Sequence, residues 1–219
     1  MGICDAVGAA CGYARGGIGG AIGLGCIASA IAIIEFSPMD NLQETVRDVT
    51  STEAAFSTAA QSSGQPAGMQ VGVYHNQILR AVFERQGASL SQMNEEEIAL
   101  AIEREMKDMG LQEGWLAEVA EQYSLQDFKY SLEGDTSAEA YVGRLCSKYP
   151  FVGQELVVLR TVLEGFDSIN NEDGLASYSE SVIRIIAESA IQNEAKTTLI
   201  SGTSVAFESK QLWNLSKSE

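Results

Sequence analysis

His75 is the only histidine of the chain, and it stands beside Asn76 in the segment VGVYHNQIL. A histidine presented in a groove can act as an acid or a base near neutral pH. The pair can equally be structural, with the ring nitrogens bonded to a backbone carbonyl or to a hydroxyl group of a facing helix. Because no second histidine and no nearby cysteine accompanies the pair, we favour the structural interpretation and predict no catalytic residue.

Acidic residues between positions 95 and 105 raise the question of a carboxylate pair or a cation site. These residues are Glu95, Glu96, Glu97, Glu103 and Glu105. The aspartate-rich pattern of a calcium loop is absent, and consecutive acids in the first turn of a helix usually form a solvated face that suits the helix dipole. We therefore interpret them as surface residues and predict no metal site.

The cysteines and the glycine-rich motifs give no sign of a cofactor. Three cysteines lie in an apolar segment and the fourth stands alone, without CxxC or Cys/His spacing, so we expect free thiols; they are Cys4, Cys11, Cys26 and Cys146. The runs GGIGG and GAIGLG lack the lysine and serine of a P-loop and the strand context of a dinucleotide site. The sequence predicts no cofactor.

Small residues recur every four positions in the first thirty-four residues. One row is Gly8, Gly12, Gly16 and Gly20, and a second is Gly17, Ala21, Gly25 and Ser29. Positions four apart stack on one face of a helix, and such small-residue stripes let apolar helices approach closely in lipid. We predict a glycine zipper whose helix-packing or oligomerisation positions are Gly8, Gly12, Gly16, Gly17, Gly20 and Gly25.

The length of this segment suggests where it acts. No charge lies between Arg15 and Glu35, and nineteen helical residues span roughly 28 Å, close to the ~30 Å of a hydrocarbon core. Each glycine costs about 1 kcal/mol in a helix in water, whereas lipid leaves the helix as the state that satisfies the backbone. We predict an apolar helix or helical hairpin that contacts membrane lipid or another copy through residues 3–34. Packing on the same protein and disorder stay open as alternatives.

The net charge argues against nucleic acid as a partner. The chain of 219 residues has 14 basic and 30 acidic residues, for a formal charge of −16. Residues 1–36 hold one base and two acids, so −15 remains in residues 37–219. Such a surface repels phosphate backbones and disfavours lying flat on an anionic leaflet. We predict no nucleic-acid partner and infer no small-molecule substrate.

Three sections follow from the pattern: the glycine-rich segment 1–36, a polar connecting stretch 37–68, and an acidic helical domain 69–219. Apolar residues at helical spacing, with no sustained alternation, predict an all-α fold in which about six helices form an antiparallel bundle. We expect a turn at 171–174 and leave 124–133 unassigned. The expected helices are 69–86, 91–109, 113–122, 137–149, 154–170, 179–191 and 193–215.

The last of these helices is rich in small residues, which predicts tight helix packing rather than a ligand groove. The segments GVYHNQIL and SVAFESKQLW together resemble a group of uncharacterised secreted or surface-associated proteins of gut Bacteroidetes bacteria. Many of those proteins also carry a glycine-rich, bacteriocin-like stretch. The matching residues are Gly72, His75, Asn76, Leu79, Ser204, Val205, Ala206, Ser209 and Trp213. The resemblance implies that the His-Asn helix and the C-terminal helix meet.

These observations lead to one functional expectation and one alternative. We expect a bacterial, membrane-associated or secreted, non-enzymatic protein, although no leader is recognisable in the sequence. Bacteriocin-like or pore-forming action is one form of this expectation. The alternative is a soluble helical interaction module whose glycine segment packs on its own bundle.

Overall fold

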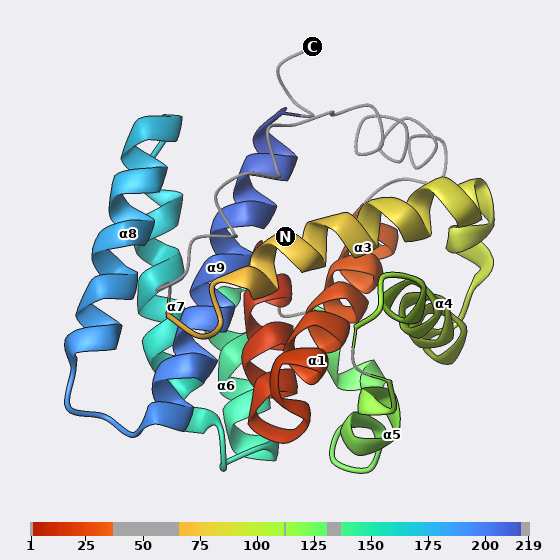
Figure 1. Ribbon diagram of the computed structural model, residues 1–219, viewed down its shortest axis with the longest axis horizontal. Helices are drawn as coiled ribbons and strands as arrows, with labels where there is room; N and C mark the ends of the chain where they lie inside the picture. Colours follow the sequence, from red (N-terminus) through yellow and green to blue (C-terminus); the bar gives the residue numbers. More distant parts are fainter. Residues whose placement is uncertain (1, 37–65, 112, 131–136, 216–219) are drawn as a thin grey trace.

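The computed structural model describes residues 2–36, 66–111, 113–130 and 137–215 (Figure 1). Most of the predicted connecting stretch 37–68 therefore lies outside the described residues. Within the described ranges every regular element is a helix, so the predicted all-α class is confirmed.

Helix α1 (Gly2–Phe36) is a hairpin rather than one straight rod. Gly16 (φ −113°, ψ 15°) and Gly17 (φ 56°, ψ −144°) leave the helical conformation. The positive φ of Gly17 lies in a region that glycine enters without a side-chain clash. The bend separates an N-terminal arm (residues 2–15) from a C-terminal arm (residues 18–36). Of the two predicted forms, the hairpin is the one observed, and the glycine rows do not form a continuous stripe along one helix.

Seven further α-helices follow α1 in the described residues, together with two short 3₁₀ helices, η2 (Gly87–Gln92) and η3 (Leu125–Phe128). The α-helices are α3 (Gln70–Gln86), α4 (Glu95–Asp108), α5 (Trp115–Ala120), α6 (Ala138–Lys148), α7 (Gly153–Asp167), α8 (Glu172–Glu188) and α9 (Asn193–Leu215). The range predicted for the last helix matches α9, and the other ranges differ mainly at their ends.

Local capping explains where several helices begin and end. The Asn94 side chain accepts a hydrogen bond from the Glu97 amide, and the Glu97 carboxylate accepts one from the Asn94 amide. This capping box satisfies two amides that α4 itself leaves unpaired. Ser137 caps α6 in the same sense by accepting from the amide of Ala140. Gly110, with a φ of 71°, follows the end of α4.

Two predicted boundaries are wrong for physical reasons. The segment 171–174 is not a turn, because the Asn171 side chain accepts a hydrogen bond from the Gly174 amide and so caps α8. Asparagine and glycine favour both turns and helix starts, and this ambiguity misplaced the start of α8 by seven residues. The helix predicted from residue 91 instead begins at Glu95, after η2.

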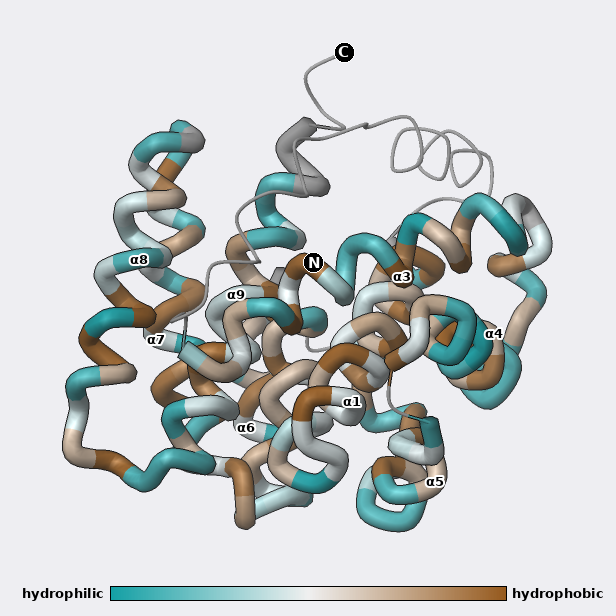
Figure 2. The backbone as a smooth tube through the Cα atoms, viewed as in Figure 1, coloured by the Kyte–Doolittle hydropathy of each residue, from teal (hydrophilic) through white to brown (hydrophobic). Residues whose placement is uncertain are grey.

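The hairpin lies at the centre of the bundle. Helix α9 runs along it, and α3, α4, α5 and α7 also pack against it (Figure 1). Residues 19–33 are all buried, as expected for a helix that is apolar all round. The outer helices alternate hydrophilic and hydrophobic stretches along each turn (Figure 2). Both arms and the bundle therefore share one hydrophobic core.

Candidate functional site

The two arms of α1 pack on each other through glycine. A Cβ atom built on Gly12 would overlap the carbonyl oxygen of Gly20, and one built on Gly20 would overlap that of Gly12. A Cβ on Gly8 would lie 2.7 Å from the Leu24 carbonyl oxygen. At Gly25 the same atom would lie 3.4 Å from the Asp5 carbonyl oxygen. Four of the six predicted packing positions thus bring backbone against backbone within one chain, while Gly16 and Gly17 form the bend.

Several elements of the bundle hold the outside of this hairpin. The indole ring of Trp115 on α5 lies directly against Gly23, where a Cβ atom would overlap it. The Tyr123 hydroxyl donates a hydrogen bond to the Cys11 carbonyl oxygen at 2.7 Å. Each arm is therefore fixed by a large aromatic side chain, because the hairpin itself offers little side-chain volume for packing.

His75 is the centre of a buried polar cluster between α1 and α3. Its Nε2 atom lies 2.9 Å from the Ser29 hydroxyl, and its Nδ1 atom lies 2.9 Å from Asn76 Oδ1. The Asn76 amide nitrogen donates to the Glu208 carbonyl oxygen, which identifies Oδ1 as the acceptor facing the ring. Nδ1 therefore carries a proton, and Nε2 faces the Ser29 hydroxyl, with the Gly25 backbone as a further hydrogen-bond partner of the ring. Both ring nitrogens are satisfied by the neutral form of the histidine.

Burial favours that neutral form. His75 is completely buried, and the loss of water around it lowers its pKa, although the charge of Asp5 and the bond to Asn76 act in the opposite direction. The order hydroxyl, imidazole, amide resembles a nucleophilic relay in its connectivity. The Ser29 side chain is, however, sealed in the core at 1% exposure. The contacts that His75 makes are those of a structural histidine bonded to a hydroxyl group on a facing helix.

Asp5 is a member of this buried region that sequence reasoning missed. The residue is completely buried, and neither carboxylate oxygen has a hydrogen-bond partner among the described residues. It lies beside the cluster, since the space next to Gly25 is bounded by the Asp5 carbonyl oxygen and the His75 ring. The only clue in the sequence was an acid placed among small apolar residues. A buried carboxyl group that has no partner among the described residues lowers the stability of the packed hairpin.

The two segments that carry the family resemblance meet in space, which confirms the structural expectation drawn from them. The Ser204 hydroxyl donates to the Met69 carbonyl oxygen at 2.6 Å and accepts from the Gly72 amide at 3.2 Å. Ser209 is buried, and its hydroxyl oxygen has no partner among the described residues. Trp213 belongs to the last turns of α9, and its side chain lies outside the described residues.

The acidic residues of α4 make ion pairs and caps. Glu95 pairs with Lys129 at 2.5 Å, and this partner lowers the pKa of its carboxyl group. Glu105 is buried and pairs with Arg85 at 2.9 Å.

Three of the four free cysteines lie in the hairpin, where burial raises their pKa and keeps them as thiols. Within the described ranges no three histidine, cysteine or acidic side chains gather as a metal site would require.

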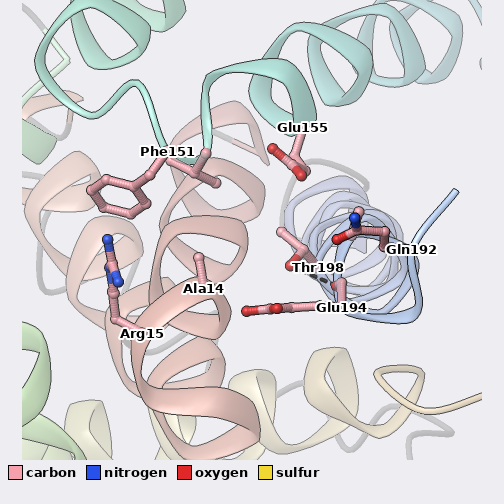
Figure 3. Close-up of a pocket in the computed structure, with 9 residues that line it drawn as sticks. Ala14, Arg15, Phe151, Glu155, Gln192, Glu194 and Thr198 are labelled. Atoms are coloured by element: carbon pink, nitrogen blue, oxygen red, sulfur yellow. Dashed lines mark hydrogen bonds between the residues drawn. The ribbon is translucent and has the colours of Figure 1, made fainter.

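A surface pocket of about 210 Å³ opens beside the bend of the hairpin (Figure 3). The guanidinium carbon of Arg15 lies 3.9 Å from the centre of the Phe151 ring. The residues that line the pocket are Ala14, Arg15, Phe151, Val152, Glu155, Gln192, Glu194, Ala195 and Thr198. They come from α1, from the connections between α6 and α7 and between α8 and α9, and from the starts of α7 and α9. Sequence reasoning missed this pocket because these segments lie far apart along the chain.

No protein-family model matches this chain, and neither curated proteins nor solved structures give a match. The resemblance to the Bacteroidetes proteins therefore stays a prediction from the two short segments. Any functional assignment depends on the geometry described above.

Proposed function

We propose that this protein is a non-enzymatic, membrane-associating protein that stores an apolar hairpin in the core of an acidic helical bundle and transfers it to a bilayer. The observation that supports this proposal is the composition and position of α1. Among the described residues, α1 is the element that by length and composition could cross a membrane, over Ile3–Glu35, and because it bends at Gly16 and Gly17 the continuous apolar helix within it is the C-terminal arm (residues 18–36). It is also the element against which α3, α4, α5, α7 and α9 pack.

The glycine contacts support transfer of the hairpin as a unit. The arms meet through backbone atoms at Gly8, Gly12 and Gly20, so these contacts between the arms can be kept when the hairpin leaves the bundle. In lipid, close approach through small residues is a strong source of helix association. The C-terminal arm has a length of roughly 28 Å, which matches the hydrocarbon thickness. In a more specific version of this proposal, the inserted hairpin has bacteriocin-like or pore-forming action.

A second candidate is an interaction module in which the hairpin stays in place. The complete burial of residues 19–33 favours it, because the core helix of a protein that never meets lipid has the same length and composition. The two candidates differ in one respect that is open to measurement. Only the first requires α1 to lose its contacts with α5 and α9 when vesicles are present.

Trp115 provides the reporter for this difference. The chain has two tryptophans, so Trp213→Phe leaves the one whose ring lies against Gly23. With phosphatidylcholine vesicles, membrane transfer predicts co-flotation of the protein, a red shift of the Trp115 emission and stronger quenching by acrylamide. Flotation without any change at Trp115 supports surface binding with the hairpin retained. Absence of flotation from every vesicle composition contradicts the membrane proposal and leaves the interaction module.

Release of an enclosed dye tests the pore-forming version separately. The intact chain is compared with the Gly12→Leu variant, in which the new side chain prevents the arms from meeting. Leakage caused by the intact chain and lost in the variant is the expected result. Flotation without leakage removes pore formation and keeps membrane association.

A further inference from the structure

The pocket beside the hairpin bend has walls of opposite charge. Figure 3 shows Arg15 and Phe151 on one side, Glu155 and Glu194 on the other, and Ala14 between them. The charged side chains belong to separate elements, so the bundle fold is what places them around one opening. A pocket of this kind distinguishes a ligand with two charges from a ligand with one.

The positive wall is held in a fixed orientation. The Arg15 guanidinium stacks on the Phe151 ring, and Arg15 forms no ion pair with a residue of the described ranges. Stacking on an aromatic face restricts the guanidinium plane and leaves its edge donors free. Those donors suit the oxygens of a phosphate group.

The negative wall is formed at the starts of two helices. Glu155 lies in the first turn of α7 and Glu194 in the first turn of α9, where the helix dipole favours a carboxylate. Neither carboxylate pairs with a basic side chain in the part of the chain that the structure describes. The Thr198 hydroxyl, at the buried end of the pocket, donates to the Glu194 carbonyl oxygen at 3.0 Å and so fixes the backbone there.

Exposed apolar side chains surround this pocket. Ile18 follows the hairpin bend and is 47% exposed, Phe151 is 42% exposed, and Ile191, next to the pocket residue Gln192, is 43% exposed. The bend of α1, the connection between α6 and α7, and the connection between α8 and α9 all lie at the lower end of the molecule in Figure 1. Apolar side chains around a polar pocket suit the boundary between lipid headgroups and acyl chains.

We propose that this pocket binds a phosphate–ammonium zwitterion, the headgroup chemistry of phosphatidylethanolamine, with the phosphate on Arg15 and the ammonium group between Glu155 and Glu194. The acidic wall repels a phosphate that carries no cation, and Arg15 repels an ammonium group that carries no anion. A zwitterion satisfies both walls. The lipid form of this ligand rests on the proposed membrane association, whereas headgroup recognition does not.

Glycerophosphoethanolamine is the water-soluble probe, titrated into the full chain by calorimetry or by NMR. The expected result is saturable binding that neither inorganic phosphate nor ethanolamine reproduces at the same concentration. Arg15→Gln and Glu194→Gln should each weaken binding at least tenfold, while Arg184→Gln and Glu180→Gln on the exposed face of α8 leave it unchanged. If a pocket variant fails to fold, Glu155→Gln supplies a second test of the acidic wall.

Binding equal to that of inorganic phosphate, or unaffected by both pocket variants, overturns the zwitterion site. Flotation with phosphatidylethanolamine and phosphatidylglycerol vesicles separates the two proposals. If the free headgroup binds but no vesicle does, the pocket stands and membrane association fails. If vesicles bind but the free headgroup does not, membrane association stands and the headgroup site fails.

Discussion

Helix α4 and the hairpin α1 show two different ways of holding a helix in one protein. Helix α4 has a capping box, three acids in its first turn and one apolar face, so much of its stability is local. The hairpin has many glycines and is buried on every side over residues 19–33. Its helical state depends on backbone contacts between the arms and on the surrounding bundle. Replacing glycine with alanine should therefore lower the free energy of unfolding inside the hairpin and raise it on the exposed face of an outer helix.

The largest effect is expected from Gly12→Ala. Because its Cβ atom would overlap the Gly20 carbonyl group, the arms must separate, and overpacking of this kind should lower the free energy of unfolding by about 3 kcal/mol or more. Gly143 on the exposed face of α6 has no atom within 4 Å of the added Cβ. Gly143→Ala should instead raise stability by up to about 1 kcal/mol. Urea denaturation of both variants measures the contrast, and equal effects would show that the arms do not pack as described.

The interior and the surface should also differ in their response to pH. Burial raises the pKa of Glu208 from 4.5 to about 7. A raised pKa in the folded state means that the stabilising contribution is present below pH 4.5 and is lost as the pH rises through 7, by about 3 kcal/mol. The Glu208→Gln variant should lose this dependence.

Glu180→Gln on the surface of α8 serves as the matched control. His75 acts in the opposite direction, since its lowered pKa removes stability as the pH falls below 6.5. The difference between wild type and Glu208→Gln cancels that contribution, because both proteins retain His75. A difference that stays constant between pH 4.5 and pH 7.5 would contradict the buried position of Glu208.

A smaller change, an increase in the free energy of unfolding, is expected when Asp5 is replaced. The Asp5→Ala variant removes a buried side chain whose two oxygens have no hydrogen-bond partner among the described residues, so the free energy of unfolding should rise by about 1–2 kcal/mol. Thermal unfolding of this variant is compared with that of Glu121→Gln, a surface control. A loss of stability would show that the Asp5 carboxylate has a partner of its own.

The smallest change in the free energy of unfolding is expected at the N-cap of α4. Removing the cap with Asn94→Ala should destabilise the protein by about 1 kcal/mol, since the bond from the Glu97 amide to the Asn94 side chain is lost while the Asn94 backbone amide can still donate to the Glu97 carboxylate. Chemical denaturation measures this change, and Asn94→Asp, which keeps an acceptor oxygen, should retain most of the stability. If the alanine variant is as stable as wild type, α4 is stabilised by packing, as the hairpin is.

The same contrast explains which features the sequence predicted. The α9 range and the acidic first turn at Glu95–Glu97 depend on neighbours a few residues away, so periodicity and the charge pattern of a helix start indicated them, although the start of α4 was predicted four residues too early. The small residues of α1 were also recognised, but their partners were not. Whether Gly12 meets a second molecule or Gly20 depends on the bend at Gly17, and glycine is compatible with either conformation.

The candidate sites likewise combine features that nearby residues determine with contacts between segments that are distant in the sequence. The structural interpretation of His75 anticipated a hydroxyl group on a facing helix, but nothing in the sequence identified that group as Ser29. The charged pocket needed Arg15, Glu155 and Glu194 to come from three segments, and no local pattern joins them. Contacts between distant segments are set by the tertiary fold, which helical periodicity alone does not specify.

The position of α1 in the chain has a consequence for biosynthesis. Ribosomes make the hairpin before the residues between Phe36 and Asn193, yet α9 is the helix that covers it most extensively. At ordinary elongation rates roughly ten to thirty seconds separate the two events. During that interval the apolar hairpin of the nascent chain is not yet covered by α9, and chaperones or a nearby bilayer can bind it. The order of translation thus gives lipid an opportunity to meet this segment before the finished bundle encloses it.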